Sequence, residues 1–195
     1  HRMAALAPAL RLPVLLAVVA VGLGFAIWLF SHPVALAAYA AAWLAFAAYS
    51  LPPVRLKGRG FLGVIADAAG AHLFPSLYVY AIASSLGSGS DGEGDLLTVA
   101  ALAVWSMALG IRGNLWHQLA DASADRAAGV STFGSRPDAG ACARRATPWL
   151  LVLEFCALAV LLVCWDATHF WIFAPLYLIV AWGRRRLWRI RTSAV

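Results

Sequence analysis

Residues 13–30 read PVLLAVVAVGLGFAIWLF, eighteen consecutive residues without one charged side chain. Runs of similar character follow at 34–50, 61–86, 96–116, 148–165 and 169–183. None of them alternates apolar and polar residues with a period of two, as a half-buried strand would. A bilayer core of about 30 Å needs roughly 20 apolar residues per helix, and only helices and closed barrels span it. The sequence therefore predicts an all-α, polytopic bundle with about six transmembrane helices.

The overall composition supports the same class of protein. Of the 195 residues, 63% are hydrophobic and 12% are charged, whereas soluble domains average roughly 45–50% and about 25%. A net charge of +6 suits a nucleic-acid-binding protein only when the cations share one folded face. Here the basic residues lie in the connections between apolar runs. The composition excludes a soluble domain, predicts contact with membrane lipid, and gives no reason to expect nucleic acid as a partner.

The distribution of basic residues predicts the orientation. All fifteen Lys and Arg residues lie on alternate connections: at Arg2 and Arg11, in the 51–60 segment, from Arg112 to Arg145, and from Arg184 to Arg191. By the positive-inside rule, both ends of this chain face the cytoplasm, in the inner membrane if the protein is bacterial. The 51–60 and 117–147 loops are then on the same, cytoplasmic side. The basic 184–191 segment is interpreted as a topological anchor, with binding to anionic lipid head groups as the alternative.

The most polar segment follows the fourth apolar run and reads NLWHQLADASADRAAGVST, residues 114–132. If the fourth helix continues through it, spacings of four, three and four residues put one set of polar side chains on a single face: Asn114, Gln118, Asp121 and Asp125. Two carboxylates one turn apart suit Mg²⁺, which takes its remaining ligands from water and substrate phosphates. A solvated helix end is the alternative interpretation of the two aspartates. Gly129 is expected to end the helix.

A second polar segment, YSLPPVRLKGR at residues 49–59, is predicted to lie on the same side of the membrane. The paired prolines are expected to stop the second helix. Three cations then follow: Arg55, Lys57 and Arg59. They suit a diphosphate group, and routine positive-inside residues are the alternative.

Together these two segments resemble the intramembrane prenyltransferases of the UbiA superfamily. The similarity rests on YSxPPxRLK at 49–57, on DxxxD at 121–125 followed by GxxT at 129–132, and on their order and separation. It implies a helical bundle whose central cavity opens to the cytoplasm and to lipid. It also implies an enzyme that uses Mg²⁺ to transfer a polyprenyl group from a polyprenyl diphosphate to an acceptor within the membrane. Neither the acceptor nor the prenyl chain length can be deduced from the sequence.

The resemblance assigns roles to individual residues. Asp121 and Asp125 are the implied Mg²⁺ ligands, and together with Lys57 they are the implied catalytic residues. The side chains implied to contact the substrate are Tyr49, Arg55, Lys57, Asn114, His117 and Gln118. For His117, a structural hydrogen bond is the alternative role.

The chain departs from the family pattern in one respect. The first Asp-rich motif of the family, NDxxDxxxD, is absent. Aligned on the matching segments, the chain begins at the third helix of a nine-helix bundle and ends after the eighth. We therefore expect residues 1–195 to form one partial prenyltransferase-like domain, without its N-terminal helices and last helix, that is inactive by itself. A shortened natural paralogue that has lost half of its metal site is the alternative.

Other functional classes remain open at this level. CDP-alcohol phosphotransferases also carry aspartate clusters at a cytoplasmic membrane face, but their DGxxAR segment does not occur here. A non-catalytic membrane subunit or transporter gains support from the missing motif. Ionisable residues inside apolar runs are candidates for function. Asp67 and His72 either line a cavity or form interhelical hydrogen bonds, and Glu154 has no assigned role.

Overall fold

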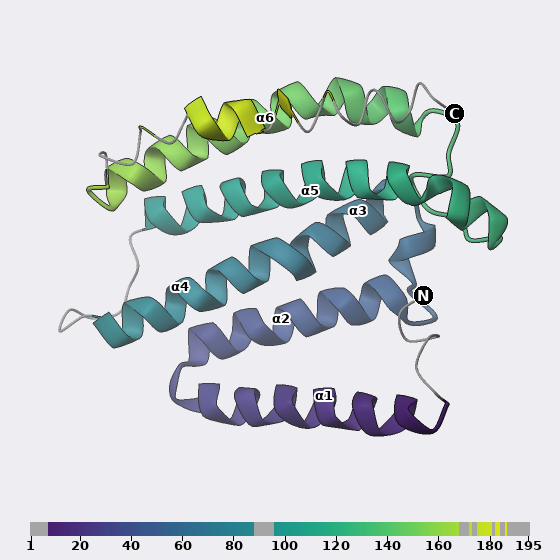
Figure 1. Cartoon of the computed structure of the whole chain (residues 1–195). Helices are drawn as coiled ribbons and strands as arrows, with labels where there is room; N and C mark the ends of the chain where they lie inside the picture. The colour runs from purple at the N-terminus through teal and green to yellow at the C-terminus, as the bar shows by residue number, and fades with distance from the viewer. Residues whose placement is uncertain are drawn as a thin grey trace.

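The structure, a computed structural model, describes residues 8–87, 96–167, 172, 175–180, 182–183 and 186. Within those residues every regular element is a helix, and the main ones lie side by side in chain order (Figure 1). They are α1 (Pro8–Trp28), α2 (Pro33–Ser50), α3 (Phe61–Ala68), α4 (Phe74–Gly87), α5 (Leu96–Ala127) and α6 (Ala139–Cys164). The predicted all-α class is confirmed.

Five helical stretches are long and apolar enough to cross a membrane, and α3 and α4 form one of them together. Outward-facing side chains such as Leu16, Val21 and Leu44 are largely exposed, as lipid-facing residues are. These stretches correspond to the first five predicted runs. The sixth run, 169–183, and the basic 184–191 segment lie mostly outside the described residues, although 175–180 is helical. The protein is a helical membrane protein; its orientation stays a prediction.

The connection predicted at 117–147 is much shorter than expected. α5 continues to Ala127 and α6 already begins at Ala139, so that only residues 128–138 form the turn. Pro148, the first residue of the predicted 148–165 run, lies inside α6. A proline there costs one backbone hydrogen bond. The early start of α6 offsets this cost because it buries Ala139 and Ala143 in the apolar core.

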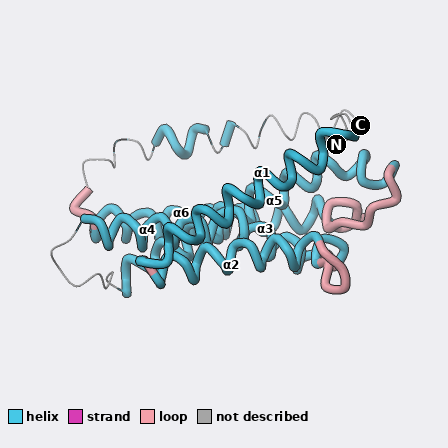
Figure 2. The backbone as a smooth tube through the Cα atoms, turned by 90° about the horizontal axis from the view of Figure 1, so that it is seen from below, coloured by secondary structure: helices cyan, strands magenta, loops and turns pink. Residues whose placement is uncertain are grey.

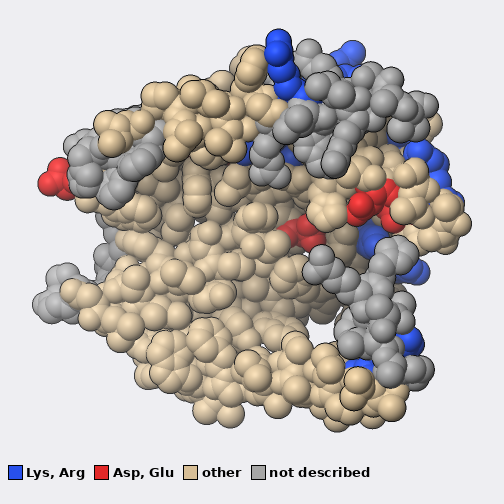
Figure 3. All heavy atoms as spheres, viewed as in Figure 1, with Lys and Arg blue, Asp and Glu red and all other residues tan. Residues whose placement is uncertain are grey.

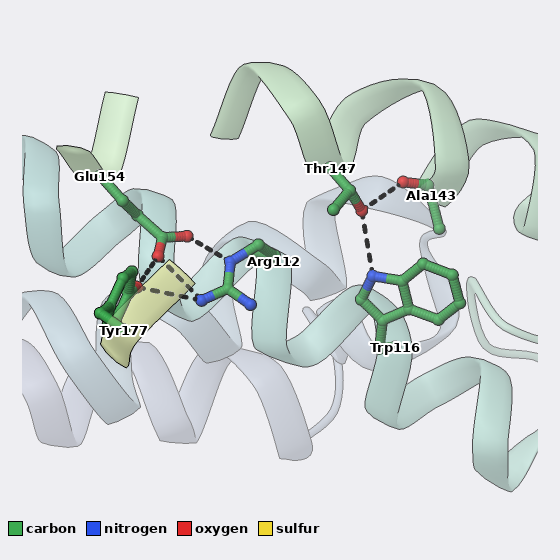
Figure 4. Close-up of polar contacts among 6 residues, drawn as sticks. All are labelled: Arg112, Trp116, Ala143, Thr147, Glu154 and Tyr177. Atoms are coloured by element: carbon green, nitrogen blue, oxygen red, sulfur yellow. Dashed lines mark hydrogen bonds and ion pairs between the residues drawn. The ribbon is translucent and has the colours of Figure 1, made fainter. Parts of the chain in front are cut away.

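The charge pattern predicted that Arg112 lies in a loop. In the structure it lies within α5. Its Nη2 atom is 2.8 Å from Oε2 of Glu154, and a second contact joins Nε to Oε1 (Figure 4). The hydroxyl of Tyr177 also donates to Glu154 and accepts from Arg112 at 3.2 Å. These residues join α5, α6 and the 175–180 helix. Glu154, which had no role in the sequence analysis, is therefore the centre of a buried polar network.

α3 and α5 run antiparallel and pack through small residues. The side-chain amide of Asn114 donates to the carbonyl oxygen of Val64 at 3.3 Å. Four residues further along α3, Ala68 faces Gly110, where an added Cβ would lie 3.0 Å from the Cβ of Ala68. Close contact through Ala and Gly is the common mode of association between membrane helices. The two contacts define one register, which places the site residues relative to one another.

The loops at 51–60 and 128–138 lie at the same end of the bundle, which we call the polar end. It is on the right in Figure 1, and Figure 2 shows both loops together at one end of the tube. A buried cluster of Val64, Leu115 and Phe133 supports it from inside. In Figure 3, acidic side chains lie in the middle of this end with basic side chains beside them. The candidate motifs thus meet at an end of the bundle that carries charged side chains of both signs.

Candidate functional site

The two segments that carry the sequence motifs contact each other at the polar end. The rings of Phe61 and Phe133 pack edge to face with their centroids 6.1 Å apart. An added Cβ on Gly58 would lie 3.7 Å from the carbonyl oxygen of Ser131. Two stretches that are far apart in the sequence therefore form one surface, as their order on alternate connections had predicted.

The DxxxD segment lies on α5, which ends where the sequence analysis expected. The amide of Val130 donates to the carbonyl of Asp125 at 2.8 Å, and the amide of Gly129 donates to the carbonyl of Arg126 at 3.1 Å. This pair of hydrogen bonds is the Schellman C-cap. It requires a positive φ at Gly129, where φ is 65°, and glycine adopts this conformation without strain.

The two aspartates have different surroundings. The side chain of Asp121 is 56% exposed, and its Oδ2 atom lies 3.1 Å from Nδ1 of His117. Asp125 is half-buried and accepts a hydrogen bond of 2.9 Å from the hydroxyl of Thr132. The second contact joins the DxxxD and GxxT motifs across the turn. The contact of His117 with Asp121 agrees with its alternative role, a structural hydrogen bond. That His117 lines the site stays a prediction.

Asn114 and Gln118 form a buried pair of amides one turn deeper. Nε2 of Gln118 donates to Oδ1 of Asn114 at 3.3 Å, and Asn114 in turn holds the backbone of Val64. Gln118 is only 7% exposed, and its Oε1 atom has no hydrogen-bond partner in the part of the chain that the structure describes. A buried acceptor without a partner costs about 1–3 kcal/mol. This oxygen is therefore a ready acceptor for a donor group of a bound molecule.

The 49–59 segment contributes two of its candidate residues to this group. Tyr49 is half-buried at the end of α2 and lies within electrostatic range of Asp67 and Asp125. Lys57 is half-buried in a short 3₁₀ turn, Leu56–Gly58, and interacts with Asp67. Arg55, by contrast, is exposed, and its side chain makes no hydrogen bond or ion pair within the described residues. The structure thus brings Tyr49 and Lys57 into the site and leaves Arg55 at its edge.

Asp67 belongs to the same group, although the sequence analysis left its role open. It lies within electrostatic range of His117, His72 and Lys57. The helix changes from α to π geometry at Ala69–Leu73, where each turn contains more residues, so the five-residue spacing to His72 suits one face. π-helical turns occur frequently at functional sites. The signal in the sequence was an ionisable pair within an apolar run.

The carboxylates of α5 form a small set of oxygen ligands for a metal ion. In residues 8–87, 96–167 and the described positions beyond, no group of three or more His, Cys, Asp or Glu side chains could hold one. Mg²⁺ needs only one or two protein carboxylates when water and substrate phosphate complete its octahedron. Asp121 and Asp125 fit that smaller requirement, and Asp125 has one oxygen that Thr132 does not engage.

Comparison of the chain with models of known protein families, with curated proteins and with solved structures finds no match. The fold and the site define the class, a helical membrane protein with a polar cluster at one end of its bundle. Any closer relationship rests on the two motifs and stays a prediction.

Gly134 lets the 128–138 turn pack closely against the backbone of α5. An added Cβ would lie 2.0 Å from the carbonyl oxygen of Gln118 and 2.4 Å from its carbonyl carbon. Gly134→Ala should displace the turn and lower the free energy of unfolding by about 3 kcal/mol, measured as a lower melting temperature in detergent. Gly113→Ala on α5 is the control, because nothing lies within 4 Å of its added Cβ. Equal melting temperatures for the two variants would contradict this account.

Proposed function

We propose that the protein transfers a prenyl group from a polyprenyl diphosphate to an acceptor within the membrane, with Mg²⁺ bound by Asp121 and Asp125. The observation that carries the proposal is the contact between the two motif segments at the polar end. In support, Gly58, which follows Lys57, faces the carbonyl oxygen of Ser131, and Tyr49 lies within electrostatic range of both Asp67 and Asp125. Lys57 lies within electrostatic range of Asp67, so a cation and carboxylates occur at the same end of the bundle. A diphosphate with its metal ion needs this combination of charges.

Each residue has a distinct task in this proposal. The carboxylates of Asp121 and Asp125 hold the metal ion, and Lys57 neutralises part of the charge on the diphosphate. The buried Oε1 atom of Gln118 accepts a hydrogen bond from the substrate or from a water that accompanies it. When bound, Mg²⁺ supplies the positive charge that stabilises a leaving diphosphate. Charges fixed in place before the reaction stabilise the charge that develops on the leaving group.

A non-catalytic membrane subunit or transporter with a cation site is the second candidate. The observation in its favour is that both aspartates already have protein partners, His117 and Thr132. A site of two partnered carboxylates suits reversible binding of a cation as well as catalysis. Release of diphosphate separates the two functions, because only the transferase breaks a bond of the donor.

The test uses the full-length protein in lipid nanodiscs with geranyl, farnesyl or geranylgeranyl diphosphate. We expect release of diphosphate that depends on Mg²⁺ and stops with EDTA. Lys57→Met should slow this release about 100-fold, the usual effect of removing one charge-stabilising group. Arg59→Met is the matched control, because Arg59 lies in the same loop and binds the carbonyl of Pro53 instead. Donor binding without diphosphate release, or equal effects of the two variants, would contradict the proposal.

A further inference from the structure

We propose that Asp67 is a catalytic base of this transfer. Its carboxylate accepts the proton that the acceptor loses when the acceptor forms its bond to the prenyl carbon. The inference rests on the proposed function and adds a catalytic residue to it. It requires an acceptor whose nucleophilic atom carries a proton.

Asp67 lies deeper in the bundle than Asp121. The contacts of Val64 with Asn114 and of Ala68 with Gly110 fix the antiparallel register, and in this register Asp67 is level with Ile111. Asp121 lies ten residues further along α5, which is about 15 Å along the helix axis. Side chains lean toward the N-terminus of their own helix. Because α3 and α5 are antiparallel, Asp67 and Asp121 lean toward each other and the gap narrows by a few ångströms.

This separation leaves room for the reacting groups. An attacking atom stands about 3–3.5 Å from the reacting carbon, and a hydrogen bond to a base spans about 2.8 Å. These two distances cover about 6 Å of the gap between Asp121 and Asp67, and the diphosphate of the donor would occupy the rest. A donor held by Asp121 and Lys57 would thus present its reactive carbon, and an acceptor beyond it, to Asp67.

Side chains that can carry positive charge surround Asp67. Lys57, His72 and His117 all lie within electrostatic range of its carboxylate. No hydrogen bond from the described part of the chain engages the Asp67 carboxylate, which leaves its oxygens available to a ligand. The ring of His72 lies against α5, where an added Cβ on Gly110 would meet its Cδ2 atom at 2.9 Å. Packing therefore holds the π-helical turn beside Asp67 in place.

The unpartnered acceptor on α5 is an independent indication of a ligand here. Oε1 of Gln118 is buried without a partner in the described residues. Its side chain is joined through Asn114 to the carbonyl of Val64, one turn before Asp67 on α3. A polar group of the acceptor or of an attendant water would satisfy this oxygen. The acceptor molecule would then place a hydrogen-bond donor near Gln118 and its reacting proton near Asp67.

The proposed step balances without a further reactant. The allylic C–O bond of the donor breaks, and its electron pair leaves with the diphosphate. An electron pair of the acceptor forms the new bond to that carbon, and the bond between the acceptor atom and its hydrogen breaks. The proton goes to the carboxylate of Asp67, and from there to water at the polar end.

The experiment separates breakage of the donor from capture by the acceptor. Geranylgeranyl diphosphate with ¹⁸O in its bridging position reports C–O breakage and return as exchange of the label into non-bridging positions. Water, which carries an O–H bond, serves as the acceptor, and geranylgeraniol measures its capture. For Asp67→Asn we expect exchange within about threefold of the wild type and a fall of about 100-fold in the ratio of alcohol to exchange. Asp67→Glu, which keeps the carboxylate, should recover part of this ratio.

Controls distinguish failure of this inference from failure of the proposed function. Asp121→Asn should lose both exchange and alcohol, because it acts on donor breakage. An Asp67→Asn protein that melts like the wild type and keeps its ratio of alcohol to exchange would overturn the role of Asp67 alone. An equal loss of exchange and alcohol in this variant would also overturn it. A wild-type protein with neither exchange nor alcohol would instead refute the proposed function.

Discussion

Asp121→Asn should lower Mg²⁺-dependent release of diphosphate by about 100- to 1000-fold and leave folding unchanged. The side chain of Asp121 is more than half exposed, and its only ion pair in the described residues is with His117. Exposed substitutions of this kind usually change stability by less than about 0.5 kcal/mol. Loss of one of two carboxylates, however, removes half of the protein charge available to the metal ion. Release of diphosphate and the melting temperature are measured on the same preparation.

Asp125→Asn should show the same loss of activity together with a small loss of stability. Its carboxylate also accepts the hydrogen bond from Thr132, which ties the turn to α5. Asparagine keeps an oxygen that can accept this bond but loses the charge, so the expected loss is the difference between a charged and a neutral hydrogen bond, about 1 kcal/mol. Asp138→Asn is the matched control, because Asp138 is an exposed aspartate at the polar end that pairs with Arg136. Retained activity in both Asp121→Asn and Asp125→Asn would refute the assignment of the metal site.

Glu154→Ala should be the most destabilising substitution in the described part of the molecule. Glu154 is 0% exposed and holds both Arg112 and Tyr177 (Figure 4). Its removal leaves the guanidinium of Arg112 buried without its counter-charge, which costs about 3–5 kcal/mol. It also removes one of the contacts that hold the 175–180 helix, although the ring of Tyr177 still packs on Phe155. The measurement is thermal unfolding in detergent, in which we expect a markedly lower melting temperature.

A double variant tests whether the unpaired charge is the cause. Arg112→Met combined with Glu154→Met removes both charges and fills similar volume, so most of the stability should return. Arg136→Met with Asp138→Met is the matched comparison on an exposed ion pair, where single and double variants should differ little. If Glu154→Ala were as stable as the double variant, the buried ion pair would not be the stabilising feature.

Local patterns predicted much of the site. The spacing of Asn114, Gln118, Asp121 and Asp125 anticipated that α5 continues through them, and Gly129 ends it as expected. These features depend on helix geometry and on one glycine with positive φ, which are properties of neighbouring residues. The resemblance implied contact with substrate for both Arg55 and Lys57. Lys57 lies within electrostatic range of Asp67, whereas Arg55 is exposed and its contact with substrate stays a prediction.

The sequence by itself determined that the helices lie in a membrane, that the fold is all-α, and which two segments lie on the same side. It could do so because the lengths of the apolar runs and the distribution of charges are properties of neighbouring residues along the chain. Only the tertiary structure decided which ionisable residues pair. Glu154 meets Arg112 across two helices, and Asp67 comes within electrostatic range of His117 through the antiparallel register of α3 and α5. Such partners are far apart in sequence. Their proximity depends on how closely small residues such as Ala68 and Gly110 let two helices approach. The sequence pattern of a single helix does not predict that interhelical distance.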